Sequence, residues 1–129
     1  MKSNRILIDA SMKGNLNEIK YALNNGADIN YKDDDGINAL HYSLCNDHLT
    51  ISKFLLDNGI DVNSKDDEKF SIMHYVALDG NDQAVNLLLQ YGAKPNEKDF
   101  YGFTPYDYAL TNQNNNYKKV LEILECNTK

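Results

Sequence analysis

The stretch "LDNGIDVN", residues 56–63, recurs twice in this chain of 129 residues. The related stretches are "LNNGADIN" at 23–30 and "LQYGAKPN" at 89–96. Their glycines share a spacing of 33 residues: Gly26, Gly59 and Gly92. A fixed period of this length is typical of repeat architectures, in which each unit buries its apolar face against its neighbours. The chain is therefore predicted to be an array of similar units.

The same period connects three helix openings, "NALHYSL" at 38–44, "SIMHYVA" at 71–77 and "TPYDYAL" at 104–110. Each opening begins with a residue whose side chain can accept a hydrogen bond from an amide of the first helical turn. These residues are Asn38, Ser71 and Thr104. Pro105 then occupies the first helical position, where its missing N–H group costs nothing. A short helix is predicted to follow each capping residue.

A second helix is predicted in each unit from apolar residues at i, i+3 and i+4. These residues are Ile51, Phe54 and Leu55 in one unit, and Ala84, Leu87 and Leu88 in the next. Gly59 and its two equivalents should end this helix in the left-handed conformation, which glycine adopts without steric strain. Polar loops at 30–36, 63–69 and 96–102, called fingers below, then lead to the next unit.

A period of 33 residues with openings similar to Thr-Pro-Leu-His resembles the ankyrin repeat. The stretch "DDDGINALHYSLCNDHLTISKFLLDNGIDVN", residues 33–63, follows the family pattern most closely. The resemblance implies an all-α repeat solenoid of stacked helix pairs joined by projecting loops that resemble β-hairpins. We expect one domain over residues 1–129, made of four repeats. Their ranges are 1–32, which caps the N-terminal end, 33–65, 66–98, and 99–129, which caps the C-terminal end.

The last repeat departs from the pattern in two ways. Asp107 stands where the interior repeats have His41 and His74. An insertion of three residues within "TNQNNN", residues 111–116, is also needed to align the last helix. The insertion brings four apolar residues onto the expected buried positions: Val120, Leu121, Ile123 and Leu124. Terminal repeats are typically more polar because no neighbour covers them.

Composition excludes several classes of partner. The formal charge is −6, and Arg5 is the only arginine beside twelve lysines, so nucleic acid is not expected to bind. No apolar run is long enough for a signal peptide or a membrane span, which predicts a soluble protein. Two cysteines, Cys45 and Cys126, form no disulfide framework and favour a reducing compartment. We expect a cytoplasmic protein, or a protein in the cytoplasm of a host cell if it is a secreted effector.

His41, Cys45 and His48 would share one face of a helix and suggest a metal site or a nucleophile with its base. The residues 33 positions later are His74, Leu78 and Asn81. The resemblance implies that His41 and His74 are structural histidines that bind backbone near the adjoining finger. A zinc site also needs four ligands, and no further ligand is suitably spaced. We therefore predict no catalytic residue, no metal and no cofactor, and keep an enzyme as a less favoured alternative.

The resemblance implies that the fingers and the first helix of each repeat contact protein partners. Three sets recur there with the period: the residue after each finger, a tyrosine in each first helix, and the position three residues beyond that tyrosine. The members are Ile37, Phe70 and Phe103; Tyr42, Tyr75 and Tyr108; and Cys45 and Leu78. Aromatic side chains supply large contact area at low entropic cost. The alternative for the tyrosines is that they only pack within the solenoid.

The finger tips grade from acidic to aromatic. Acidic residues occupy the first two tips and aromatic residues the third: Asp34 and Asp35, Asp67 and Glu68, then Phe100 and Tyr101. This gradient predicts a basic partner with an apolar anchor.

The leading interpretation is a non-enzymatic, monomeric module that binds another protein through its concave face and finger tips. Inhibitor, toxin-immunity and effector roles agree with it. A structural, self-associating unit remains the second interpretation, because the same aromatic residues could join copies of the chain.

Overall fold

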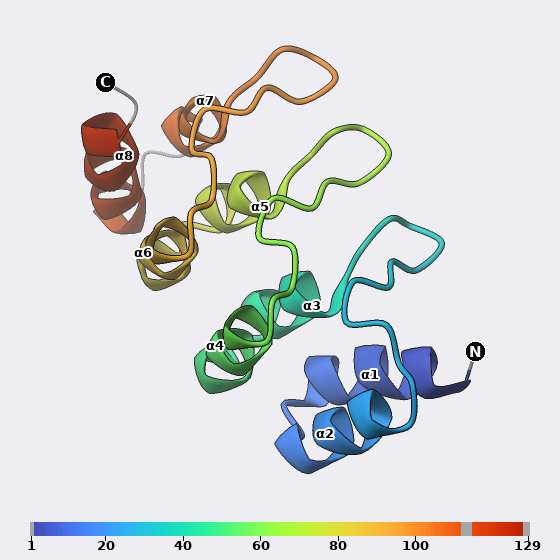
Figure 1. Ribbon diagram of the computed structural model, residues 1–129. Helices are drawn as coiled ribbons and strands as arrows, with labels where there is room; N and C mark the ends of the chain where they lie inside the picture. The colour runs from blue at the N-terminus through green and yellow to red at the C-terminus, as the bar shows by residue number, and fades with distance from the viewer. Residues whose placement is uncertain (1, 112–114, 128–129) are drawn as a thin grey trace. The chain divides into compact units, whose positions relative to one another are not determined.

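The computed structural model describes residues 2–111 and 115–127 and is built from helices and loops (Figure 1). Within these residues the elements are α1 (Lys2–Lys13), α2 (Leu16–Asn24), α3 (Ala39–Cys45), α4 (Leu49–Asp57), α5 (Ile72–Leu78), α6 (Asp82–Gln90), α7 (Pro105–Leu110) and α8 (Asn115–Asn127). The only β-type pairing in the described part is one isolated bridge, between Lys65 and Ser71. The predicted all-helical repeat architecture is confirmed. None of the described helices is long and apolar enough to cross a membrane.

The chain divides into two compact units, Met1–Asp61 and Val62–Lys129. In the first unit, α1 packs on α2 and α3, and α3 packs on α4. The largest fully buried side chains of this unit are Leu7, Ile19, Leu40, Leu44 and Leu55. They come from all four helices, so each helix contributes its apolar face to one core. The organisation of the whole chain as one domain stays a prediction.

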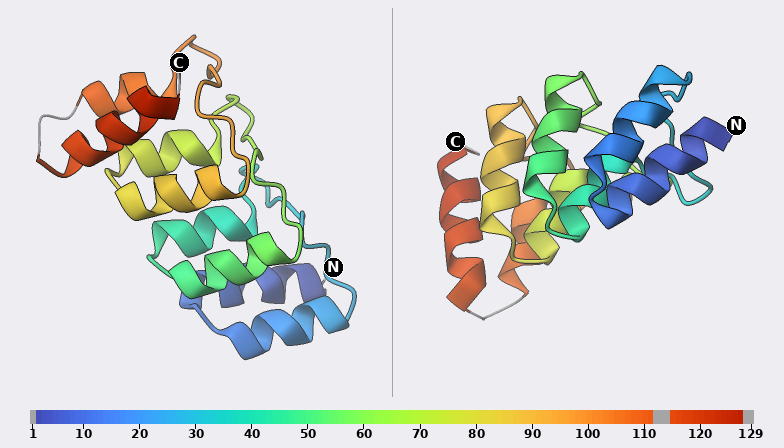
Figure 2. Two further views of the ribbon diagram at one scale, coloured as in Figure 1. Left: turned by 60° about the vertical axis from the view of Figure 1, so that its left-hand side comes forward. Right: turned by 90° about the horizontal axis from the view of Figure 1, so that it is seen from below.

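The second unit repeats this arrangement with α5 to α8 (Figure 2). There α5 packs on α6 and α7, and α8 packs on α6 and α7. Met73, Val85, Leu88, Val120 and Leu124 are fully buried. Two of the four apolar residues predicted for the last helix are thus in the core, and Leu121 and Ile123 are half-buried. The insertion proposed to align this helix falls partly on residues 112–114, outside the described residues.

The predicted start and stop signals act as expected. Asn38 Oδ1 accepts from the His41 amide at 3.0 Å, and Ser71 and Thr104 accept from the equivalent amides at 3.2 Å. Pro105 is the first residue of α7. The helices α2, α4 and α6 each end shortly before a glycine of positive φ, as in Gly59 with φ of 87°. Local sequence chemistry therefore sets the bounds of these short helices.

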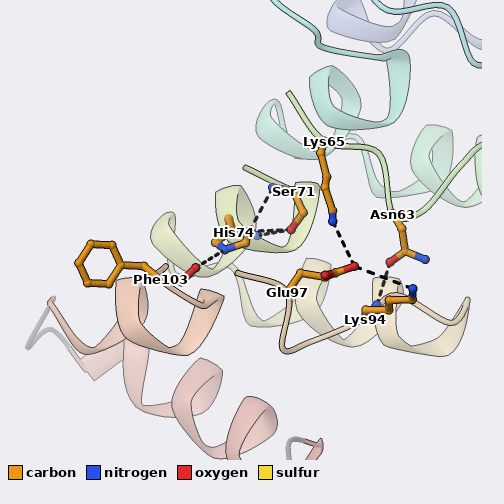
Figure 3. A network of polar contacts seen from close by, with 7 residues as sticks. All are labelled: Asn63, Lys65, Ser71, His74, Lys94, Glu97 and Phe103. Atoms are coloured by element: carbon orange, nitrogen blue, oxygen red, sulfur yellow. Dashed lines mark hydrogen bonds and ion pairs between the residues drawn. The ribbon is translucent and has the colours of Figure 1, made fainter. Parts of the chain in front are cut away.

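His74 connects its own helix to Phe103, the residue that follows the third finger (Figure 3). Its Nδ1 accepts a hydrogen bond from the Ser71 amide at 3.1 Å, and its Nε2 donates to the Phe103 carbonyl at 2.9 Å. Burial lowers the pKa of His74 and outweighs the opposing effect of the Phe103 carbonyl. A neutral imidazole can accept at one nitrogen and donate at the other, as this geometry requires. The structural role predicted for His74 is confirmed.

A second set of contacts joins the start of the second finger to Lys94 and Glu97, near the start of the third finger (Figure 3). Asn63 Oδ1 accepts from the Lys94 amide at 2.9 Å. The Lys65 ammonium lies 3.2 Å from the Glu97 carboxylate. Asn30 makes the equivalent bond in the first unit, where its Oδ1 accepts from the Asp61 amide at 2.8 Å. Asn30 and Asn63, which close the first two repeated stretches, thus each bind backbone of the stretch that follows.

Asn38 differs from the equivalent Ser71 in one respect. Asn38 is 2 % exposed, and its Nδ2 group has no hydrogen-bond partner in the described structure. A buried N–H donor without a partner loses its hydration with no compensation. The capping function needs only the side-chain oxygen, which serine also supplies.

We expect Asn38→Ser to raise the free energy of unfolding by about 1 kcal/mol, because the cap is kept and the unsatisfied donor is removed. Urea denaturation followed by circular dichroism measures the change. The reciprocal variant, Ser71→Asn, should lower the free energy of unfolding by at least as much. Equal stability of the wild type and Asn38→Ser would contradict the cost assigned to this amide.

Candidate functional site

Each finger is closed by an aspartate at its fourth position. In the first finger, Asp33 Oδ1 accepts from the amides of Asp35 and Ile37, both at 3.0 Å. Its Oδ2 accepts from the hydroxyl of Tyr42, nine residues further on in α3. The carboxylate therefore ties the turn of the finger to the first helix of the same repeat.

The same aspartate clamp occurs twice in the second unit. Asp66 Oδ1 accepts from the amides of Glu68 and Phe70 at 2.9 and 3.0 Å, and Oδ2 accepts from the Tyr75 hydroxyl at 2.9 Å. The third clamp consists of Asp99, the amides of Tyr101 and Phe103, and the Tyr108 hydroxyl. A 33-residue ladder of aspartates paired with tyrosines nine positions later was present in the sequence as a signal for this unit.

The electrostatics of the clamps follow from these bonds. Burial raises the pKa of Asp99, but hydrogen bonds from Tyr108 and from two backbone amides act against burial and leave that pKa below its usual range. The hydrogen bond to Asp99 and burial raise the pKa of Tyr108 to about 12. Burial and the bond to Asp33 raise the pKa of Tyr42 in the same direction. The third clamp therefore pairs a carboxylate with a protonated phenol at neutral pH.

The tyrosine ladder thus has a packing role, which is the alternative considered from the sequence. Tyr75 and Tyr108 also hold Phe70 between edge-to-face contacts, with ring centroids 4.6 and 5.0 Å apart. Phe70 lies 4.8 Å from the His74 ring as well. Whether these half-buried rings also touch a partner stays a prediction.

The other predicted contact residues differ in accessibility. Ile37 is 9 % exposed and therefore the least accessible of the set. Phe100 and Tyr101 are 71 % and 64 % exposed, and their rings contact each other edge to face at 5.7 Å. The remaining exposed members are Asp34, Asp35, Cys45, Asp67, Glu68, Leu78 and Phe103. The most accessible aromatic side chains of the described structure are therefore on the third finger.

A hydrogen bond between backbone groups connects the second and third fingers. The Phe100 amide donates to the Glu68 carbonyl at 2.8 Å. This bond brings the acidic tip of Asp67 and Glu68 next to the aromatic tip of Phe100 and Tyr101. Acidic and aromatic side chains are thus neighbours in space as well as members of one sequence ladder.

His41, Cys45 and His48 have three different surroundings. His41 is buried, Cys45 is exposed, and His48 Nε2 donates to the Met12 carbonyl at 3.0 Å. Across the described residues, no three His, Cys, Asp or Glu side chains are grouped so that they could hold a metal ion.

The clamp predicts an acid-sensitive stability. The carboxyl of Asp99 has a lower pKa in the folded chain than its usual value of 3.8, so the unfolded chain binds its proton more readily. This contribution is fully present above pH ~4 and is lost as the pH falls through the folded-state pKa. We expect Asp99→Asn to lower the free energy of unfolding by about 2 kcal/mol at pH 7, and to lessen its decline from pH 5 to pH 3.

Urea denaturation at several pH values measures both effects. Asp67→Asn is a matched control, because Asp67 is exposed at a finger tip. A pH profile for Asp99→Asn that parallels the wild type would show that the clamp carboxylate does not contribute to acid sensitivity.

Comparison with known proteins agrees with this geometry. A family model described as ankyrin repeats (3 copies) matches residues 2–66, and another, described as ankyrin repeats (many copies), matches residues 55–109. A search of curated proteins found no match. Ankyrin repeats are generally protein–protein interaction modules, and proteins built from them are typically non-enzymatic. With one model covering half of the chain and the other continuing over the next repeats, this chain belongs to the ankyrin-repeat family.

Proposed function

We propose that this chain is a non-enzymatic module that binds another protein through its fingers and the first helices of its repeats. The observation that carries the proposal is the exposure of Phe100 and Tyr101, at 71 % and 64 %, on one finger. Neighbouring exposed aromatic rings are costly to leave in water and typically mark a binding site. Phe103, which follows this finger, adds a third exposed ring. These rings supply the apolar anchor of the contact.

The acidic tips supply the charge of the proposed contact. Asp67 and Glu68 are exposed beside the aromatic finger, and Asp34 and Asp35 are exposed on the first finger. A partner with basic side chains around an apolar patch would complement both features. The net charge of −6 would further speed its association with a basic surface at low salt. Inhibition of a basic protein, as by an immunity protein or an effector, agrees with this chemistry.

Self-association is the second candidate, favoured by the same exposed rings. Two copies could bury Phe100 and Tyr101 against each other without any basic partner. Size-exclusion chromatography with light scattering separates the two candidates. A monomer at micromolar concentration supports binding of a different molecule, and a dimer abolished by Phe100→Ser supports self-association.

The first prediction concerns the aromatic finger. Phe100→Ser/Tyr101→Ser should abolish capture of the natural partner, because anchors of this type contribute about 2 kcal/mol or more each to binding. Affinity capture from cells of the source, compared by mass spectrometry between wild type and variant, measures the loss.

Tyr21→Ser is the matched control, because Tyr21 is an exposed aromatic residue on α2, away from the fingers. It should retain the partner that the double variant loses. Retention of the same proteins by the double variant would contradict an aromatic anchor on the third finger.

The second prediction concerns the acidic tips. Reversing the charge of Asp34, Asp35, Asp67 and Glu68 to lysine should abolish binding to a basic partner, since like charges across an interface repel. Binding of the wild type should also weaken as salt increases. Unchanged affinity of the reversed variant, measured by calorimetry with the captured partner, would reject the basic-partner proposal and leave the aromatic anchor to its own test.

A further inference from the structure

A groove of about 620 Å³ lies in the first unit, between α1 and the first finger. Lys2, Arg5 and Asp9 of α1 line one side, and Tyr31 and Asp34 of the finger line the other. Tyr42 of α3 also contributes to the lining. The volume is in the range of specific ligand sites in proteins. The aromatic finger of the proposed contact belongs to the second unit, and the groove shares only Asp34 with the residues of that contact.

The groove has a cationic end. Lys2 and Arg5 are three positions apart on α1 and therefore lie on the same face of the helix. Both side chains are exposed, and neither forms an ion pair or hydrogen bond with any residue in the described part of the chain. Arg5 is the only arginine of the protein. An arginine held in a groove without a carboxylate partner is available to bind one bidentately.

The groove also has acidic groups available to a ligand. Asp9 and Asp34 are exposed and line the same space. Asp33 lines it too, but its two oxygens already accept from two amides and the Tyr42 hydroxyl. A purely acidic ligand would be repelled by Asp9 and Asp34, and a purely basic ligand by Lys2 and Arg5. Charge complementarity therefore favours a ligand that carries both signs.

The spacing along α1 sets the spacing in the ligand. Arg5 and Asp9 are four residues apart, about 6 Å along the helix axis, and Lys2 and Asp9 about 10 Å. An extended peptide advances about 3.3 Å per residue, so two or three residues cover this range. Ile8, Met12 and Tyr31 also line the groove and add apolar surface to it.

We propose that this groove binds an extended segment of a partner protein with an acidic and a basic side chain two or three positions apart. The acidic side chain pairs with Arg5 and Lys2, and the basic side chain pairs with Asp9 and Asp34. This inference rests on the proposed function, since it specifies one segment of the partner. It adds Lys2, Arg5 and Asp9 of α1 to the proposed contact, and Asp34 of the first finger belongs to both.

Selection of random peptides displayed on phage tests the proposal with the purified full chain. Wild-type protein should enrich peptides with acidic and basic residues at this spacing. Lys2→Glu/Arg5→Glu should lower the affinity for the selected peptides at least tenfold, because a charge-assisted contact is lost. Lysine in place of the acidic residue of the peptide should restore binding to this variant. The variant is expected to fold, because glutamate near the start of a helix interacts favourably with the helix dipole.

Lys13→Glu/Lys53→Glu is the matched control, because it changes the net charge equally at exposed residues outside the groove. It should leave peptide affinity unchanged. Enrichment without the charge pattern, or affinities that Lys2→Glu/Arg5→Glu does not alter, would overturn the groove proposal.

The two proposals can fail independently. Phe100→Ser/Tyr101→Ser should bind the selected peptides as the wild type does, although it should lose the natural partner. Suppose that the selected peptides show the charge pattern, but the natural partner still binds Phe100→Ser/Tyr101→Ser. This result would contradict the aromatic anchor and leave the groove proposal standing. Suppose instead that the natural partner no longer binds Phe100→Ser/Tyr101→Ser, but the selected peptides lack the charge pattern. This result would contradict the groove proposal and leave the aromatic anchor standing.

Discussion

The arrangement of the fingers depends on the hydrogen bonds that the aspartate carboxylate at the centre of each finger accepts. One oxygen of Asp66 holds two backbone amides and so fixes the turn of the finger. The other oxygen binds Tyr75 and so fixes the finger to α5. A loop of this length would otherwise lose much conformational freedom on folding without compensation. Because the bonds are charge-assisted, each carboxylate offsets that loss better than a neutral acceptor would.

The clamps assign a structural role to residues that recur with the period and leave other finger residues without one. The tyrosine of each clamp is committed to its aspartate, and Phe70 is committed to two such tyrosines. The side chains of Phe100 and Tyr101 are exposed and take no part in the clamps, which leaves them available for the recognition we propose. Repeat proteins separate structural and recognition positions in this manner, since each repeat needs the same contacts to its neighbours.

Much of the fold could be predicted because its signals are local. A capping oxygen at Asn38, Ser71 or Thr104 acts within one helical turn. A glycine of positive φ, such as Gly59, ends a helix through its own backbone. The period of 33 residues then multiplies each local signal by three. Accessibility was harder to predict, because Ile37 and Phe103 occupy equivalent positions, yet one side chain is buried and the other exposed.

The sequence by itself determined the repeat, the helix starts and stops, the family and the acidic balance of the chain, because these depend on residues close together or on composition. Only the tertiary structure decided how the side chains are used. It bound Tyr42 to Asp33 and placed Arg5 and Asp34 in the lining of one groove. Arg5 and Asp34 come from different predicted repeats, so their presence in one groove depends on how α1 packs near the first finger. Packing of that kind is a property of the folded unit, and no short stretch of residues encodes it.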